Sequence, residues 1–122
     1  MVEFTSDKPI YRQIIDYAFA CILGGGWQSG QKVPSVRELA VALAVNTHTV
    51  LKAYDELQAH GIIVPRRGMG FFLADDAQAR VHAEQNQEFF DTTLTEIFTR
   101  MESLGIDFAQ LEAAYKKFRD CR

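Results

Sequence analysis

Residues 34–73 constrain the fold of this chain more than any other stretch. Ser35 and Glu38 form an S-x-x-E capping box, which predicts a helix that starts at the residue after Ser35. Asn46 is a favourable N-cap for a following helix, and Gly61 suits the position just beyond its end. The stretch therefore predicts two short amphipathic helices joined by a tight turn.

A small β-hairpin is predicted directly after the second helix. Two short runs of β-forming residues, 62–64 and 71–73, flank the tip Arg66-Arg67-Gly68, and glycines there permit a tight turn. Two helices followed by a hairpin are the layout of a winged helix-turn-helix, which places its second helix in the major groove of DNA.

Helical patterns also precede and follow this stretch. Apolar residues recur at helical spacing over 9–23, and three glycines then end that helix. Residues 75–104 contain neither Pro nor Gly and are predicted to form one long helix. After Gly105, Asp107 and Gln110 resemble a second capping box, which predicts a final helix.

The predicted fold is therefore mainly α with a small β-hairpin. We expect a winged helix-turn-helix domain at residues 1–74 and a C-terminal antiparallel helical hairpin at residues 75–122.

The charge of the chain is unevenly divided. The net charge of −3 at first argues against a nucleic-acid partner. Residues 1–74, however, contain seven Lys or Arg against six Asp or Glu, whereas residues 75–122 contain six against ten. Because the potential at a DNA surface depends on where charges lie, the first part remains the candidate for DNA binding.

Composition also limits the class of protein. Cys21 and Cys121 lie a hundred residues apart without metal-site spacing, so we expect free thiols in a reducing cytosol, and a cytoplasmic protein. The apolar run 17–26 is too short to span a bilayer and lacks the basic flank of a signal peptide. Paired carboxylates, a nucleophile with its base and metal-ligand spacing are all lacking, so the sequence predicts no enzyme, cofactor or metal site.

The first turn of the second predicted helix carries the chemistry for reading bases. Thr47 and Thr49 offer hydroxyls to bases or phosphates, and Lys52 offers a cation to phosphate one turn later. The threonines could instead cap the helix, and His48 could be an ordinary solvated side chain.

Arginines outside this helix complete the predicted DNA contacts. Arg37, in the helix that crosses the DNA backbone, is placed for phosphate unless it merely pairs with Glu38 or faces solvent. Arg66 and Arg67 at the hairpin tip are suited to a minor groove, the alternative being a solvated wing. The full predicted DNA-binding set is Ser35, Arg37, Thr47, His48, Thr49, Lys52, Arg66, Arg67, Gly68 and Gly70.

The predicted C-terminal helices carry a long apolar stripe. Its spacing of four and three residues is heptad-like, and a stripe this apolar is unusual on the exposed helices of a small protein. We therefore expect a homodimer, although the stripe could also fold back onto the winged domain of its own chain. The predicted dimer residues are Phe90, Leu94, Ile97, Phe98, Met101, Leu104, Leu111, Tyr115 and Phe118.

Several motifs in fixed order resemble the GntR family of bacterial transcription regulators. They are P-S-x-R-E-L-A from Pro34, V-N-x-x-T-V-x-K-A-Y from Val45, R-R-G-x-G from Arg66, and Y-R-Q-I-I at residues 11–15. The short tail is similar to that of the YtrA-like branch. The resemblance implies a dimer that binds double-stranded operator DNA, and a repressor of a linked operon, frequently one for a transporter. It does not determine whether a small-molecule effector binds, and it does not give the operator sequence.

Three positions depart from the family pattern. Phe71 stands where Thr or Ser is usual, Leu51 stands where many members have a basic residue, and Thr47 replaces a common Pro or Arg. Reading of the major groove must therefore depend on Thr47, His48, Thr49 and Lys52.

Two functions from different classes remain open at this point. One is a DNA-binding transcription regulator, and the other is a winged-helix module that binds a protein and not DNA. The basic set Arg37, Lys52, Arg66 and Arg67 favours the first, because a protein-binding module does not need all four at DNA-facing positions.

Overall fold

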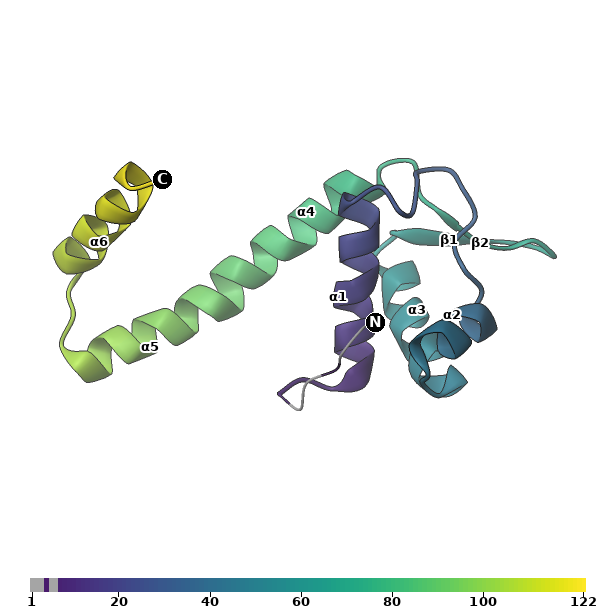
Figure 1. Cartoon of the computed structure of the whole chain (residues 1–122), viewed down its shortest axis with the longest axis horizontal. Coiled ribbons are helices and arrows are strands. Elements are labelled where there is room, and N and C mark those ends of the chain that lie inside the picture. Colours follow the sequence, from purple (N-terminus) through teal and green to yellow (C-terminus); the bar gives the residue numbers. More distant parts are fainter. Residues whose placement is uncertain (1–3, 5–6) are drawn as a thin grey trace. The chain divides into compact units, whose positions relative to one another are not determined.

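The computed structural model describes residue 4 and residues 7–122. The chain divides into two compact units, Met1–Ala83 and Glu84–Arg122. In order, the elements of the first unit are α1 (Ile10–Leu23), α2 (Val36–Leu43), α3 (Thr47–Ala59), β1 (Ile63–Arg66), β2 (Gly70–Leu73) and the start of α4 (Ala77–Glu88) (Figure 1).

The predicted helix starts are confirmed by their caps. The Ser35 hydroxyl accepts from the backbone N–H of Glu38, whose carboxylate accepts from the backbone N–H of Ser35, completing the capping box of α2. The Asn46 side chain accepts from the backbone N–H of His48 and caps α3. Pro9 is the N-cap residue of α1 and does not itself have helical geometry. The helix therefore begins at Ile10, one residue later than expected.

The turn between α2 and α3 is tight and partly strained. Ala44 ends α2 with a left-handed φ of 56°, a conformation that side chains with a Cβ seldom adopt. The backbone N–H of Val45 donates to the carbonyl of Ala40 at 3.0 Å and closes the turn. This geometry brings α2 and α3 side by side (Figure 1).

The hairpin forms where the sequence predicts it, with strands shifted by one or two residues. β1 and β2 are antiparallel, with Ile63 opposite Leu73 and Arg66 opposite Gly70. The segment before α2 adds to the sheet, since Lys32 forms a bridge with Phe72. The hairpin is therefore fixed on its β2 side by a stretch far away in sequence.

One apolar core holds the first unit together. Tyr54 and Leu57 of α3 are buried with side chains of α1, α2 and the hairpin. Ala77 and Val81 of α4 are fully buried in the same core. The first unit therefore extends to Ala83, past the expected boundary at residue 74.

The second unit contains the end of α4, the π-helical segment Phe89–Thr93, α5 (Leu94–Leu104) and α6 (Phe108–Asp120). The long helix predicted for 75–104 is helical from residue 77 onward, but the π-helical turn interrupts its α-helical geometry. A π turn accommodates more residues than an α turn, so Phe90 does not continue the α5 stripe at regular spacing.

The turn between α5 and α6 agrees with the sequence prediction. Gly105 ends α5 with a left-handed φ of 69°, and Asp107 with Gln110 forms the expected capping box of α6. The two helices diverge from this turn instead of packing along their lengths (Figure 1). An apolar groove of about 380 Å³ lies between them, lined by Ile97, Met101, Leu104, Ile106, Leu111 and Ala114 among others.

Candidate nucleic-acid interface

The outward face of α3 is a stripe of four exposed side chains. His48, Leu51, Lys52 and Asp55 follow one another at spacings of three, one and three residues, which places them on one side of the helix. The opposite side carries the buried residues Val50, Ala53, Tyr54 and Leu57. The helix is thus anchored by one face and presents the other to solvent.

The first turn of α3 leaves its hydroxyls free for a ligand. Because Asn46 caps the helix, neither Thr47 nor Thr49 does so. Neither hydroxyl forms a hydrogen bond with any other residue that the structure describes. Thr47 and His48 are exposed and Thr49 is half-buried, so all three predicted residues lie together at the start of the helix.

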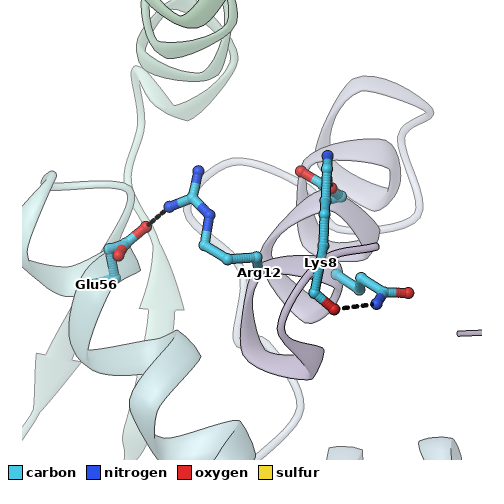
Figure 2. A network of polar contacts seen from close by, with 5 residues as sticks. Lys8, Arg12 and Glu56 are labelled. Carbon is cyan, nitrogen blue, oxygen red and sulfur yellow. Dashed lines mark hydrogen bonds and ion pairs between the residues drawn. The ribbon is translucent and has the colours of Figure 1, made fainter. Parts of the chain in front are cut away.

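Two contacts from α1 fix α3 along its side. The guanidinium of Arg12 donates to the carboxylate of Glu56 at 2.6 Å (Figure 2). The Lys52 ammonium lies 4.1 Å from the centre of the Tyr11 ring, a cation–π contact. The sequence analysis did not identify Arg12, because its partner is 44 residues away. The ion pair compensates the negative charge of the Glu56 carboxylate on the flank of α3.

The start of α2 presents a cation without a partner. Arg37 is exposed and forms no ion pair with Glu38 or with any other residue in the described part of the chain. Glu38 is instead bound to Ser35, whose backbone N–H lowers the pKa of the carboxyl below its usual value. Ser35 thus has a definite role in capping, and its hydroxyl proton remains available to an acceptor.

The wing, formed by β1, β2 and the turn between them, carries two basic side chains, Arg66 and Arg67. The backbone N–H of Met69 donates to the carbonyl of Arg66, and Gly68 within this turn has a φ of 73°. The Arg66 guanidinium stacks over the Phe72 ring at 4.2 Å, whereas Arg67 is exposed and has no such contact.

Lys32, in the segment before α2, is a third basic residue beside the wing, and the sequence does not predict it there. A Cβ atom added to Gly70 would lie 3.1 Å from the Lys32 side chain, so this lysine reaches from its pairing with Phe72 to the turn end of β2. Only the pairing of Lys32 with Phe72 brings it there, and no local pattern indicates that pairing.

Tyr54 connects α3 to the segment before α2 and to the wing. Its hydroxyl donates to the carbonyl of Pro34 at 2.6 Å, just before α2. Its ring makes edge contacts with Trp27 and with Phe71 of the wing. Burial raises the pKa of the Tyr54 phenol well above its usual value, so it remains a neutral donor. Phe71, which departs from the family pattern, therefore contributes a packing contact with Tyr54.

Residues 10–73 match the sequence profile of the bacterial regulatory proteins of the gntR family. The chain belongs to the GntR family. Over 116 residues it is 34% identical to the HTH-type transcriptional repressor YtrA of Bacillus subtilis, a match that covers 95% of this chain and 88% of that protein.

Solved structures of GntR proteins share the fold. A GntR family transcriptional regulator from Listeria monocytogenes is 40% identical, with a TM-score of 0.72, covering 93% of this chain and 98% of that one. The AraR DNA-binding domain in complex with operator ORX1 is 29% identical, with a TM-score of 0.56, covering 61% of this chain and 95% of that one.

These comparisons confirm the resemblance and the winged helix-turn-helix fold. The GntR relatives are transcription regulators and not enzymes, as the sequence predicts. Within the described residues, no helix has both the length and the apolar content that crossing a bilayer requires. In the same residues, no group of His, Cys, Asp or Glu clusters as metal ligands would.

The predicted dimer residues of this GntR chain lie at the surface of the second unit. Leu94, Met101 and Leu111 are half-buried, and the other members of the set are exposed. None of the residues in Glu84–Arg122 is buried. Phe108, which the stripe of α6 also includes, is 72% exposed.

Proposed function

We propose that this chain is a repressor that binds a palindromic operator as a homodimer and acts on a linked operon in the cytoplasm. The observation that supports the proposal is that three consecutive elements carry accessible cationic and hydroxyl groups. These groups are the Arg37 guanidinium on α2, the free hydroxyls and outward stripe of α3, and the Arg67 guanidinium on the wing.

Each element has one task in the proposed complex. The first turn of α3 enters the major groove, where Thr47, His48 and Thr49 contact base edges or phosphates. Arg37 binds phosphate beside it, and Lys52 adds a second cation. Arg66 and Arg67 follow the DNA outward into a minor groove, where Gly68 and Gly70 allow the backbone to approach closely.

The homodimer is supported by the lack of a core in the second unit. A helical region of this size with aromatic side chains such as Phe90, Phe108 and Phe118 at its surface is stable in water only when something covers them. The apolar groove between α5 and α6 is a shape that helices of a second copy fit, giving a four-helix arrangement. To enter successive major grooves, the two copies of α3 in the dimer must lie about 34 Å apart, one helical turn of DNA.

The relatives support the remaining parts of the proposal. YtrA of Bacillus subtilis is named a transcriptional repressor, and the AraR DNA-binding domain was solved with an operator. The YtrA-like tail favours an operon adjacent to the gene, with a transporter as the first candidate. Deleting the gene should raise transcription of that neighbouring operon, and unchanged transcription would remove the linked-repressor part of the proposal.

DNA binding is tested by selection from a random duplex library with the full chain, followed by anisotropy titrations at several salt concentrations. We expect an enriched inverted repeat whose affinity falls steeply with salt. Lys117→Ala, which removes a cation from α6 in the second unit, is the matched control for charge and should bind like the wild type. Selection without enrichment, together with salt-independent weak binding, would favour the protein-binding module instead.

A further inference from the structure

Leu51 is an apolar side chain in the centre of the outward stripe of α3. It is 42% exposed and has His48 one turn before it and Lys52 and Asp55 beside and after it. A single exposed leucine is ordinary on a protein surface. It lies about one turn after the free hydroxyls of α3, so its apolar character limits which groups of DNA this part of the helix can contact.

The recognition helix has few groups for reading purine bases. Residues 47–55 contain no Arg, Asn or Gln, the side chains that most often form paired hydrogen bonds with guanine or adenine. Lys52 is the one cation in this segment, and its ammonium lies over the Tyr11 ring. Base discrimination by the middle of α3 must therefore come from shape and apolar contact.

The major groove has one apolar group on its base edges, the 5-methyl group of thymine. A leucine can neither donate nor accept a hydrogen bond, so its favourable contact on a base edge is with this methyl group. We propose that Leu51 contacts a thymine methyl group in each operator half-site and thereby determines specificity there. This inference rests on the proposed function, since it needs α3 in the major groove.

The size of the effect follows from burial of one methyl group. Removing it should weaken binding about fourfold for each half-site, the change that corresponds to about one buried methylene. Two independent half-sites should together give about fifteenfold. A phosphate contact would give no dependence on the base at all.

The test replaces thymine by deoxyuridine at one symmetry-related pair of positions at a time, in the duplex selected with this chain. Deoxyuridine lacks only the 5-methyl group, so hydrogen bonding is unchanged. We expect one symmetry-related pair of positions at which the wild type loses about fifteenfold in affinity. Leu51→Ala should bind the thymine duplex more weakly and lose this difference between thymine and uracil.

Thr47 and Thr49 also carry methyl groups near the same groove, so they supply the matched controls. Thr47→Ser and Thr49→Ser each remove a methyl group and keep the hydroxyl, and the uracil effect should persist in both. The proposal is overturned if no position responds to uracil, or if the response survives Leu51→Ala. Selection without any consensus would instead overturn the proposed function, so the two failures are distinguishable.

Discussion

The two units of this chain place their apolar residues in opposite ways. In the first unit most large apolar side chains of α1, α3 and the hairpin are buried in one core, and the outward faces carry mainly polar and basic groups, with single exposed apolar residues such as Leu51. In the second unit no residue is buried, and phenylalanines on α5 and α6 lie at the surface. The first unit buries its own apolar core. The exposed apolar side chains of the second unit require a covering surface, which we infer to be that of a second copy.

The strongest way to break this comparison is to place charge on the exposed stripe. Leu94→Asp with Ile97→Asp should prevent association, because a carboxylate buried in an apolar interface has no partner. Operator affinity should fall by about 10²–10⁴-fold when two half-sites are no longer bound together. Sedimentation and anisotropy titrations measure both effects.

Ser103→Asp is the control for this variant, because residue 103 lies on the side of α5 opposite Leu94 and Ile97. It should remain associated and bind normally. Full operator affinity in the Leu94/Ile97 double variant would show that the stripe has no part in dimerisation.

Equivalent truncations in the two units should differ in their effect on stability. Leu57→Ala, at a position 1% exposed, should lower the free energy of unfolding of the first unit by about 2–5 kcal/mol. Leu104→Ala, at a position 66% exposed, should leave that unit nearly unchanged. Trp27 is the only tryptophan and packs against Tyr54, so its fluorescence reports denaturant unfolding of the first unit. Equal losses of unfolding free energy for the two variants would contradict the claim that only the first unit has a buried core.

The wing separates binding from folding within the first unit. Arg66→Ala with Arg67→Ala should weaken operator binding by about 1–3 kcal/mol, the range for charge-assisted contacts. Because Arg66 stacks over Phe72, its replacement should also lower stability, by about 0.5–1 kcal/mol. A thermal midpoint that collapses in the double variant would show instead that these arginines hold the fold. Melting and anisotropy measurements give the two quantities separately.

The smallest effects are expected for single phosphate contacts. Arg37→Ala and Lys52→Ala should each lower the slope of log affinity against log salt concentration by about one. The loss of affinity should be less than for the wing pair, because a single charge is removed. Unchanged slope and affinity in both variants would mean that the DNA-facing surface lies elsewhere.

Local structure could be read from the sequence where the interaction is local. The capping box at Ser35, the Asn46 cap and the turn at Gly105 all join residues within four positions of one another, and all are confirmed. The winged helix-turn-helix fold followed from these elements and their order.

Features that depend on long-range packing were not predictable in this way. Lys32 reaches the wing only through pairing with Phe72, and Arg12 meets Glu56 only after α1 packs on α3. Ala77 and Val81 are part of the core of the first unit although their sequence neighbours are polar. The first unit therefore ends at Ala83 and not at residue 74. The π-helical turn leaves no local pattern that distinguishes it from the α-helix around it.

The predicted DNA-binding residues are partly explained by the structure. It brings Thr47, His48 and Thr49 together and gives Arg37 no partner among the residues that the structure describes, which favours contact with DNA. Ser35 has a capping role that would hold it in place without DNA. Each contact with DNA stays a prediction, because it depends on the complex and not on the chain alone.

The measurement that tests the account most directly is the mass of the full chain in solution, alone and on its selected duplex. At micromolar concentration, sedimentation equilibrium should give twice the chain mass of 13.8 kDa, and two chains should bind each duplex. A mass of 13.8 kDa for the free chain, together with undiminished operator binding, would contradict the claim that two copies read the DNA through their C-terminal units.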